Sequence, residues 1–162
     1  MNRFLRLAVL ILPLLGVAAT SAAQERIGRV TELALPRFVS IKSTKANARR
    51  GPGLDQKIDW VFMRRNLPVR VVDEYNHWRR VEDSDGRGGW VHYSLLSGRR
   101  TVLVTQSALP IRAKPAADAR VLAQAETGVV GLLSTCTTDW CEVEMGAFDG
   151  WVPKSGIWGV DP

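Results

Sequence analysis

Two residue types in this chain, cysteine and histidine, could bind a metal or support nucleophilic chemistry. The chain has two residues of each type, Cys136, Cys141, His77 and His92. The four residues between the cysteines can form the turn of a hairpin, which would leave both sulfurs on facing strands. A close pair of this kind favours a disulfide in an exported protein, whereas a metal site would need more ligands and both histidines lie in the other half of the chain. We predict the disulfide, worth ~2 kcal/mol or less because its loop is short.

The same side chains give little support for catalysis. Nucleophilic hydrolysis needs a serine or cysteine beside an oriented histidine, but His77 lies in a predicted turn and His92 has no evident acidic partner. A pair of catalytic carboxylates would need a deep cleft. The segment Asp83-Ser84-Asp85-Gly86 lacks the later glutamate of a calcium loop. We therefore expect no enzymatic activity, no cofactor and no bound metal.

The elements around these residues are hairpins. Trp78 to Glu82 alternates apolar and polar residues, passes through an Asp-Gly turn and resumes at Trp90-Val91, a pattern typical of a β-hairpin. Trp140 to Glu144, followed by Trp151-Val152, repeats it. Both segments read W-x-x-V-x and then G-W-V, which indicates two copies of one structural unit.

Aligning the sequence with itself at an offset extends the repeat to further residues. Residues 37–49 align without a gap on residues 100–112 at a shift of 63, and Trp78 and Trp90 align on Trp140 and Trp151. Short predicted strands at 69–73, 78–82 and 89–92, with counterparts at 128–133, 140–144 and 150–152, are separated by Gly and Pro turns. This favours two small β-barrels. Each would be marginally stable alone, so packing against its twin would help.

The first residues have the layout of a secretory signal peptide. Arg3 and Arg6 precede an apolar run, and Ser21-Ala22-Ala23 offers a cleavage site. We predict a signal peptide at 1–23, a linker or loose arm at 24–35, and domains at 36–98 and 99–162. Without the two arginines, 20 basic residues remain against 16 acidic ones, a net charge of +4. This excess lacks the dense basic stripe of a nucleic-acid-binding protein.

The first copy resembles bacterial SH3-like domains. The resemblance lies in Asn47-Ala48-Arg49-Arg50-Gly51-Pro52-Gly53, Leu67-Pro68-Val69, Trp78-Arg79-Arg80-Val81 and Gly89-Trp90-Val91-His92. The second copy departs at its start, where Pro110 replaces Asn47 and Ala113-Lys114-Pro115-Ala116 replaces the Gly-Pro-Gly turn. The resemblance implies an all-β chain of two tandem small five-stranded barrels of a kind often tied to cell-wall or peptide binding.

In such barrels an aromatic groove between loops takes an extended peptide. The resemblance therefore suggests ligand-binding residues, which are Tyr75, Trp78, Trp90, Tyr93, Asn47 and Arg49. Each has a structural alternative. The two tryptophans would also serve to cover or cap the barrel, whereas tyrosine suits a half-wet groove edge. Arg49 could clamp a carboxylate or pair with a local acidic residue, and its recurrence as Arg112 favours the pairing.

We expect an exported, non-catalytic binding module in the periplasm or outside the cell. Its partner would be a peptide, peptidoglycan or an envelope protein, with no nucleic acid and no stable membrane insertion after signal cleavage. The alternatives are a periplasmic scaffold or regulator that does not bind the wall, and, less favoured, a cell-wall hydrolase.

Overall fold

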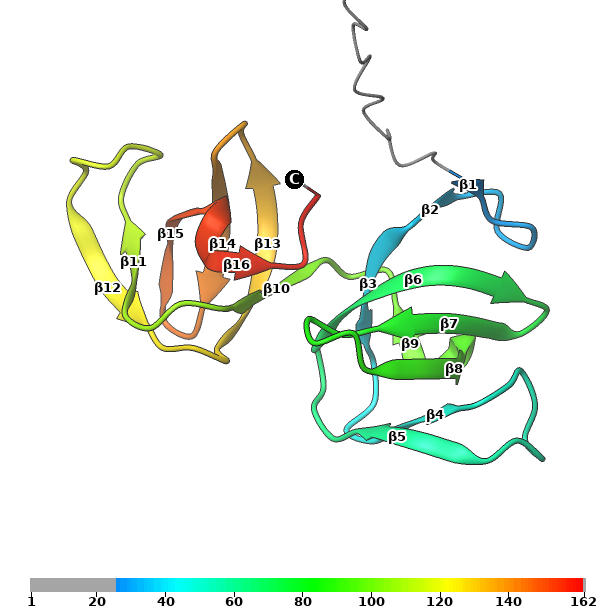
Figure 1. Ribbon diagram of the computed structural model, residues 1–162. Helices are drawn as coiled ribbons and strands as arrows, with labels where there is room; N and C mark the ends of the chain where they lie inside the picture. The colour runs from blue at the N-terminus through cyan, green and yellow to red at the C-terminus, as the bar shows by residue number, and fades with distance from the viewer. Residues whose placement is uncertain (1–25, 162) are drawn as a thin grey trace, which may run out of the picture.

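The computed structural model describes residues 26–161, so the predicted signal peptide at 1–23 lies outside the described residues. Two all-β units follow one another along the chain (Figure 1). Residues 26–161 contain no helix with the length and apolar character needed to cross a bilayer. The expected all-β architecture of two tandem units is confirmed.

The first unit is an antiparallel sheet with the strand order β5-β4-β8-β7-β6-β3-β9. Its elements are β3 (Arg37–Ile41), β4 (Ala46–Arg49), β5 (Ile58–Phe62), β6 (Pro68–Tyr75), β7 (Trp78–Glu82), β8 (Gly88–His92), the short 3-10 helix η1 (Tyr93–Leu95) and β9 (Leu96–Ser97). The three strands predicted for this copy are all present, and β6 runs two residues further than expected, to Tyr75.

The second unit has the order β12-β11-β15-β14-β13-β10-β16, which is the same topology. Its elements are β10 (Thr101–Val104), β11 (Leu109–Arg112), β12 (Val121–Ala125), β13 (Val130–Cys136), β14 (Trp140–Met145), β15 (Phe148–Pro153), η2 (Lys154–Gly156) and β16 (Ile157–Trp158). Gly128, expected at the start of a strand, instead has a φ of +87° in the turn before β13.

Each sheet has seven strands where the resemblance implied five. The difference comes from the long connection between β3 and β6, which pairs with itself as the hairpin β4–β5. The equivalent connection in the second unit forms β11–β12.

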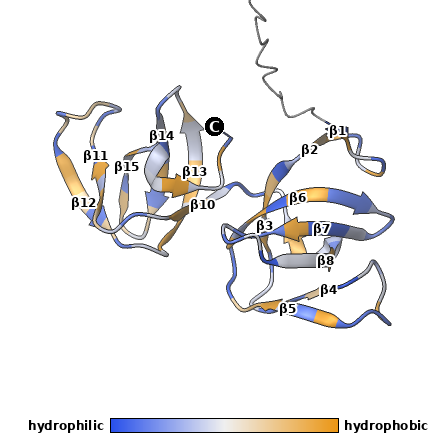
Figure 2. Ribbon diagram, viewed as in Figure 1, coloured by the Kyte–Doolittle hydropathy of each residue, from blue (hydrophilic) through white to orange (hydrophobic). Residues whose placement is uncertain are grey.

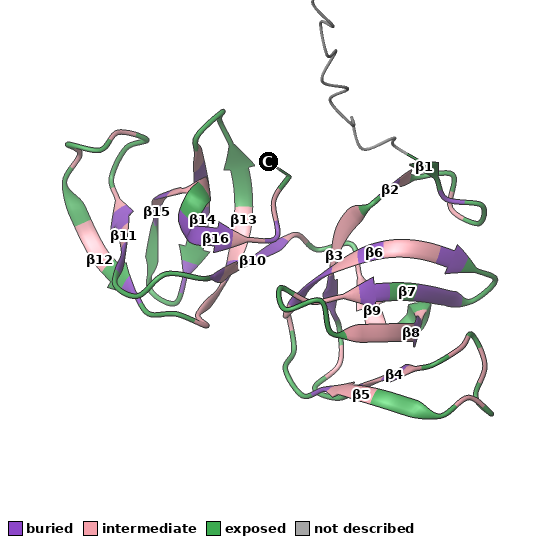
Figure 3. Cartoon of the chain, in the orientation of Figure 1, coloured by how far each residue is buried: buried purple, intermediate pink, exposed green. Residues whose placement is uncertain are grey.

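Each unit has a core of its own, because alternate strand residues point to opposite faces of the sheet. Val71, Val81 and Val91 are fully buried in the first unit, and Val143 and Val152 take the corresponding places in the second. Figure 2 shows hydrophobic (orange) stretches on the strands of both units, and Figure 3 shows buried (purple) stretches in both.

The two units also contact each other. The rings of Phe38 in β3 and Trp158 in β16 meet edge to face, with centroids 5.0 Å apart. Gly159 has a φ of +116°, and a Cβ there would lie 3.2 Å from the Cβ of Pro68. Arg64 donates a hydrogen bond to the carbonyl of Gly128. The expected packing of one barrel against its twin is therefore present.

Residues 26–35 differ from the linker predicted for 24–35. They form a small hairpin from β1 (Arg26–Ile27) and β2 (Ala34–Leu35), and Leu35 is buried in the first core. The loop of this arm lies on Glu74 in β6, and a Cβ at Gly28 would come within 2.5 Å of the carboxylate. A contact between residues more than forty positions apart leaves no local signal in the sequence.

The carboxylate of Glu74 has no exposed surface and accepts four hydrogen bonds. They come from the amides of Val30 and Thr31 (3.1 and 3.0 Å), the Thr31 hydroxyl (2.7 Å) and the Arg37 guanidinium (2.6 Å). Burial alone would raise the pKa of Glu74, but these donors outweigh it and lower the pKa from 4.5 to about 2. The ionised carboxylate thus holds the arm on the barrel.

Glu74 also forms an ion pair with Arg79, its Cα partner in β7, at 3.4 Å. In the second unit, the corresponding partners are Cys136 and Cys141, which form the predicted disulfide. The same position in the two barrels is therefore linked by an ion pair in one and by a covalent bond in the other.

We predict that Glu74 makes the stability of the first barrel depend on pH. Its pKa is lower in the folded chain than in the unfolded chain, so its contribution of about 3 kcal/mol is complete above pH ~4.5 and is lost as the pH falls towards 2. Urea denaturation of the wild type and of Glu74→Gln between pH 7 and pH 2 measures this. The two stability curves should converge at low pH, and parallel curves would contradict the prediction.

Candidate functional site

Trp90 lies in β8 between two arginines. Its Cα partners are Arg49 in β4 on one side and Arg80 in β7 on the other. Directly paired residues point to the same face of a sheet, so the side chains of Arg49, Trp90 and Arg80 leave the sheet on one face. The preceding Gly89 allows this, because its φ is +145° and a Cβ there would lie 2.6 Å from the carbonyl oxygen of Arg49. The Gly-Trp pair thus places Trp90 where β8 passes close to β4.

A hollow lies on each side of Trp90, and we call the two together the Trp90 groove. The first, about 360 Å³, is lined by Arg49, Arg50, Asp59, Arg80, Val81, Glu82, Gly86, Gly88, Gly89 and Trp90. The second, about 410 Å³, is lined by Arg26, Ile27, Arg29, Leu35, Pro52, Asp73, Glu74, Tyr75 and Trp90. The arm held by Glu74 therefore supplies one wall of the groove.

The cations of the groove differ in how far they are neutralised. Arg50 donates two hydrogen bonds to Asp59, at 3.1 and 3.0 Å, and these lower the pKa of Asp59 and raise that of Arg50. Arg49 donates to the carbonyl of Gln56 at 2.7 Å. Arg80 is exposed and has no hydrogen bond or ion pair with any of the residues 26–161. Arg29 of the arm is likewise exposed and without such a partner, but Arg80 is the one of the two that lies directly across the strand from Trp90.

The structure brings together three of the six predicted ligand-binding residues. Trp90 and Arg49 line the first hollow, and Trp90 and Tyr75 line the second. Tyr75 is 55% exposed, which agrees with a groove edge.

Trp78, Tyr93 and Asn47 lie outside the Trp90 groove. Trp78 is only 8% exposed and meets His92 edge to face at 5.5 Å. Tyr93 is 51% exposed but lines a different hollow, beside Leu33 of the arm. The Oδ1 atom of Asn47 is buried without a hydrogen-bond partner in the described part of the chain.

Arg49 is half-buried and has no acidic partner among residues 26–161. Its bond to the carbonyl of Gln56 recurs in the second unit, where Arg112 donates to the carbonyl of Ala119, also at 2.7 Å. Both arginines therefore hold the loop that follows their strand. The predicted pairing with a local acidic residue is wrong, because the partner is a backbone carbonyl.

His92 stabilises a turn. Its Nδ1 atom lies 2.8 Å from the Ser94 hydroxyl and accepts a bond from the Ser94 amide at the start of η1. His77 is exposed, as expected for a turn, with its ring 6.0 Å from that of His92. Among residues 26–161, no three His, Cys, Asp or Glu side chains are grouped as a metal site would require.

Four arginines of the groove were not among the predicted site residues. They are Arg26, Arg29, Arg50 and Arg80. The alternation of Trp78, Arg80 and Glu82 is a signal that could have identified Arg80, because it places this side chain on the face that Trp90 occupies. Arg26 and Arg29 belong to the arm, so their position depends on Glu74.

The second unit does not reproduce the cationic groove. Trp151 has Arg112 as one Cα partner, as Trp90 has Arg49, but its other partner is Glu142 where Trp90 has Arg80. Ala113 stands in the position of Arg50. Among residues 26–161, the cross-strand pair of this tryptophan with an arginine that has no partner is therefore found in the first unit and is replaced by Trp151–Glu142 in the second.

Comparison with known protein families matches residues 42–98 and 106–159 to the bacterial SH3 domain, in all more than half of the chain. The chain belongs to the bacterial SH3 domain family. Each matched segment falls on one of the two sheets, so the expected tandem arrangement of bacterial SH3 domains is confirmed. From here we refer to the two units as SH3 domains 1 and 2.

Two solved structures similar to this chain are NlpC2 and NlpC1 from Trichomonas vaginalis. The NlpC2 match has 9% identity and a TM-score of 0.36, and covers 78% of this chain and 51% of NlpC2. The NlpC1 match has 8% identity and a TM-score of 0.36, and covers 81% of this chain and 48% of NlpC1. The chain thus spans about half the length of either protein. A comparison with curated protein sequences finds no match.

We predict that Gly89→Ala destabilises SH3 domain 1 more than Gly86→Ala does. Both glycines have a positive φ, which costs an alanine ~1–2 kcal/mol. A Cβ at Gly86 meets no atom within 4 Å, whereas one at Gly89 strikes the Arg49 carbonyl. Thermal denaturation should show a clearly larger loss for Gly89→Ala, and equal losses would contradict the close approach of β8 to β4.

Proposed function

We propose that this protein is an exported, non-catalytic binding protein whose SH3 domain 1 docks an extended, partly acidic peptide along the Trp90 groove. The observation that carries the proposal is the position of Trp90 between Arg49 and Arg80, with a hollow on either side. The peptide of the bacterial cell wall is the ligand we favour.

The groove has the chemistry that such a ligand needs. A half-buried aromatic ring such as that of Trp90 packs against peptide backbone and apolar side chains at low entropic cost. Tyr75 and Pro52 extend that surface on one side. Guanidinium groups bind carboxylates with well-defined geometry. Arg80 provides such a group without a competing partner among residues 26–161.

Binding without catalysis fits the remaining side chains. Cys136 and Cys141 are joined, which removes both thiols as nucleophiles. The Nδ1 atom of His92 is committed to capping η1. We therefore assign the chain a docking role. The hydrolase alternative would require that the protein clears cell-wall material in a zymogram and that His92→Ala abolishes the clearing.

An extracytoplasmic location is supported by the disulfide and by the bacterial SH3 domains. We place the protein in the periplasm or outside the cell, on the strength of these two features and the predicted signal peptide. Its alternative role there is that of a scaffold or regulator whose partner is another envelope protein.

We predict that the mature protein sediments with purified peptidoglycan at low salt and that Trp90→Ala and Arg80→Glu release it. Arg80→Glu reproduces the residue of SH3 domain 2, Glu142, and should weaken binding about tenfold or more through loss of one attraction and gain of one repulsion. Arg120→Glu is the charge-matched control, because Arg120 is exposed on SH3 domain 2. The measurement is the bound fraction across a salt series.

Two results would separate the versions of this proposal. If the wild type remains in the supernatant at low salt, the wall is not the ligand, and cross-linking in cells followed by mass spectrometry identifies an envelope protein instead. If the wild type binds but Trp90→Ala and Arg80→Glu bind equally well, the Trp90 groove is not the site.

A further inference from the structure

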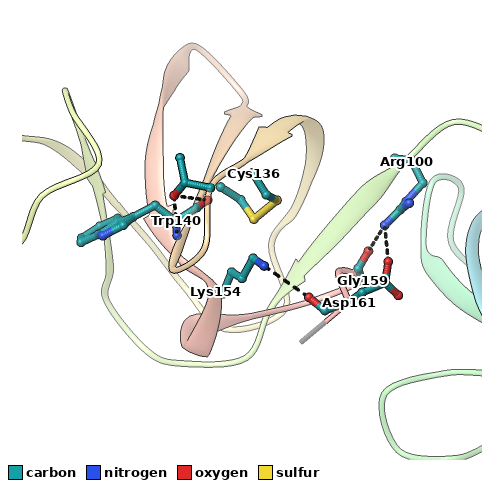
Figure 4. The surroundings of a disulfide bond; sticks show 8 residues. Arg100, Cys136, Trp140, Lys154, Gly159 and Asp161 are labelled. Carbon is teal, nitrogen blue, oxygen red and sulfur yellow. Dashed lines mark hydrogen bonds and ion pairs between the residues drawn. A yellow bond between two sulfur atoms is a disulfide. The ribbon is translucent and has the colours of Figure 1, made fainter. Parts of the chain in front are cut away.

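SH3 domain 2 has a hollow of its own beside the disulfide, which we call the disulfide hollow. Its volume is about 370 Å³, and it is lined by Arg100, Leu133, Ser134, Thr135, Cys136, Lys154, Val160 and Asp161. Figure 4 shows Arg100 and Lys154 on opposite sides of Asp161, with the disulfide nearby. Two cations, Arg100 and Lys154, and the apolar side chain of Leu133 therefore line the same hollow.

The corresponding place in SH3 domain 1 shows which partner Arg100 lacks. Arg100 aligns on Arg37 in the repeat, and Leu133 aligns on Val71. Arg37 binds the carboxylate of Glu74 at 2.6 Å. In SH3 domain 2 the position of Glu74 is taken by Cys136, whose sulfur is bonded to Cys141. Arg100 therefore occupies the position of Arg37 but has lost the carboxylate that Arg37 binds.

SH3 domain 1 has a smaller hollow at this place, of about 210 Å³. Leu33, from the arm, lines the equivalent hollow together with Arg37, Val71 and Tyr93. The arm therefore borders this hollow, and Leu33 stays 53% exposed. In SH3 domain 2, the described residues at this place are Val160 and Asp161, which follow β16.

Asp161 satisfies the two cations only weakly. Its carboxylate lies 4.0 Å from the Arg100 guanidinium, beyond hydrogen-bond distance, and 72% of its side chain is exposed. Its backbone carbonyl accepts a bond of 3.5 Å from Lys154. Arg100 donates from Nη2 to the carbonyl of Gly159 at 3.2 Å, while its Nε is buried with no hydrogen-bond partner among residues 26–161.

We propose that the disulfide hollow is a second binding site, for a carboxylate of an extended peptide. The carboxylate lies between Arg100 and Lys154 in place of the Asp161 side chain, and an aliphatic side chain packs on Leu133. This site lies on the other barrel from the Trp90 groove and does not depend on the function proposed for that groove.

The test is a titration of the ¹⁵N-labelled mature chain with two matched pairs of acetylated tripeptides, followed by NMR. One pair is Leu-Ala-Glu and Leu-Ala-Gln, both amidated, and the other is Leu-Ala-Ala with a free and with an amidated end. We expect the amide signals of residues 133–136 and 154–161 to shift with a carboxylate form and not with its neutral partner. The pair that shows the difference tells whether the carboxylate is a side chain or a chain end.

Three variants make the result specific. Asp161→Ala removes the carboxylate that competes for Arg100 and should tighten binding. Lys154→Ala should weaken binding about three- to fivefold, the effect of one partly exposed ion pair. Arg99→Ala, exposed and outside the hollow, is the control and should bind as the wild type does. Equal shifts with acid and neutral peptides, or an affinity unchanged by Asp161→Ala, would overturn the proposal.

Discussion

A buried carboxylate organises SH3 domain 1. Removing a charge from water costs several kcal/mol unless the charge is paired and hydrogen-bonded, and Glu74 meets that cost with two backbone amides, a hydroxyl and two guanidinium groups. Three of these donors come from the arm at residues 26–35. The arm in turn forms a wall of the Trp90 groove. The shape of the groove therefore depends on the hydrogen bonds that hold the arm on Glu74, which itself lines the second hollow.

The two SH3 domains show how one barrel can be completed in two ways. At one cross-strand position, SH3 domain 1 has the ion pair Glu74–Arg79 and SH3 domain 2 has the disulfide Cys136–Cys141. Glu74 of the ion pair also accepts hydrogen bonds from the arm. The disulfide has no such polar groups, and a hollow lies beside it. The exchange of Arg80 for Glu142 beside the equivalent tryptophans adds a second difference. The two SH3 domains thus share one fold but have different surfaces.

The sequence predicted what is local or periodic. The repeat, the main strands, the tandem fold and the disulfide follow from alternation, turn residues and spacing, all of which act over short distances. The groove was predicted in part, since Tyr75 and Trp90 meet there while Trp78 is buried. The arm was not predicted, because its position is set by hydrogen bonds to a residue more than forty positions away. No local pattern in residues 26–35 reports that contact.

If the ligand meets the chain at Trp90, the indole N–H signals of the six tryptophans should report the contact. They are measured by NMR on the ¹⁵N-labelled mature protein during titration with soluble peptidoglycan fragments. The signal of Trp90 should move with ligand concentration while that of Trp151, which sits beside Glu142 in SH3 domain 2, stays in place. Equal movement of both signals, or movement of Trp151 alone, would contradict the account.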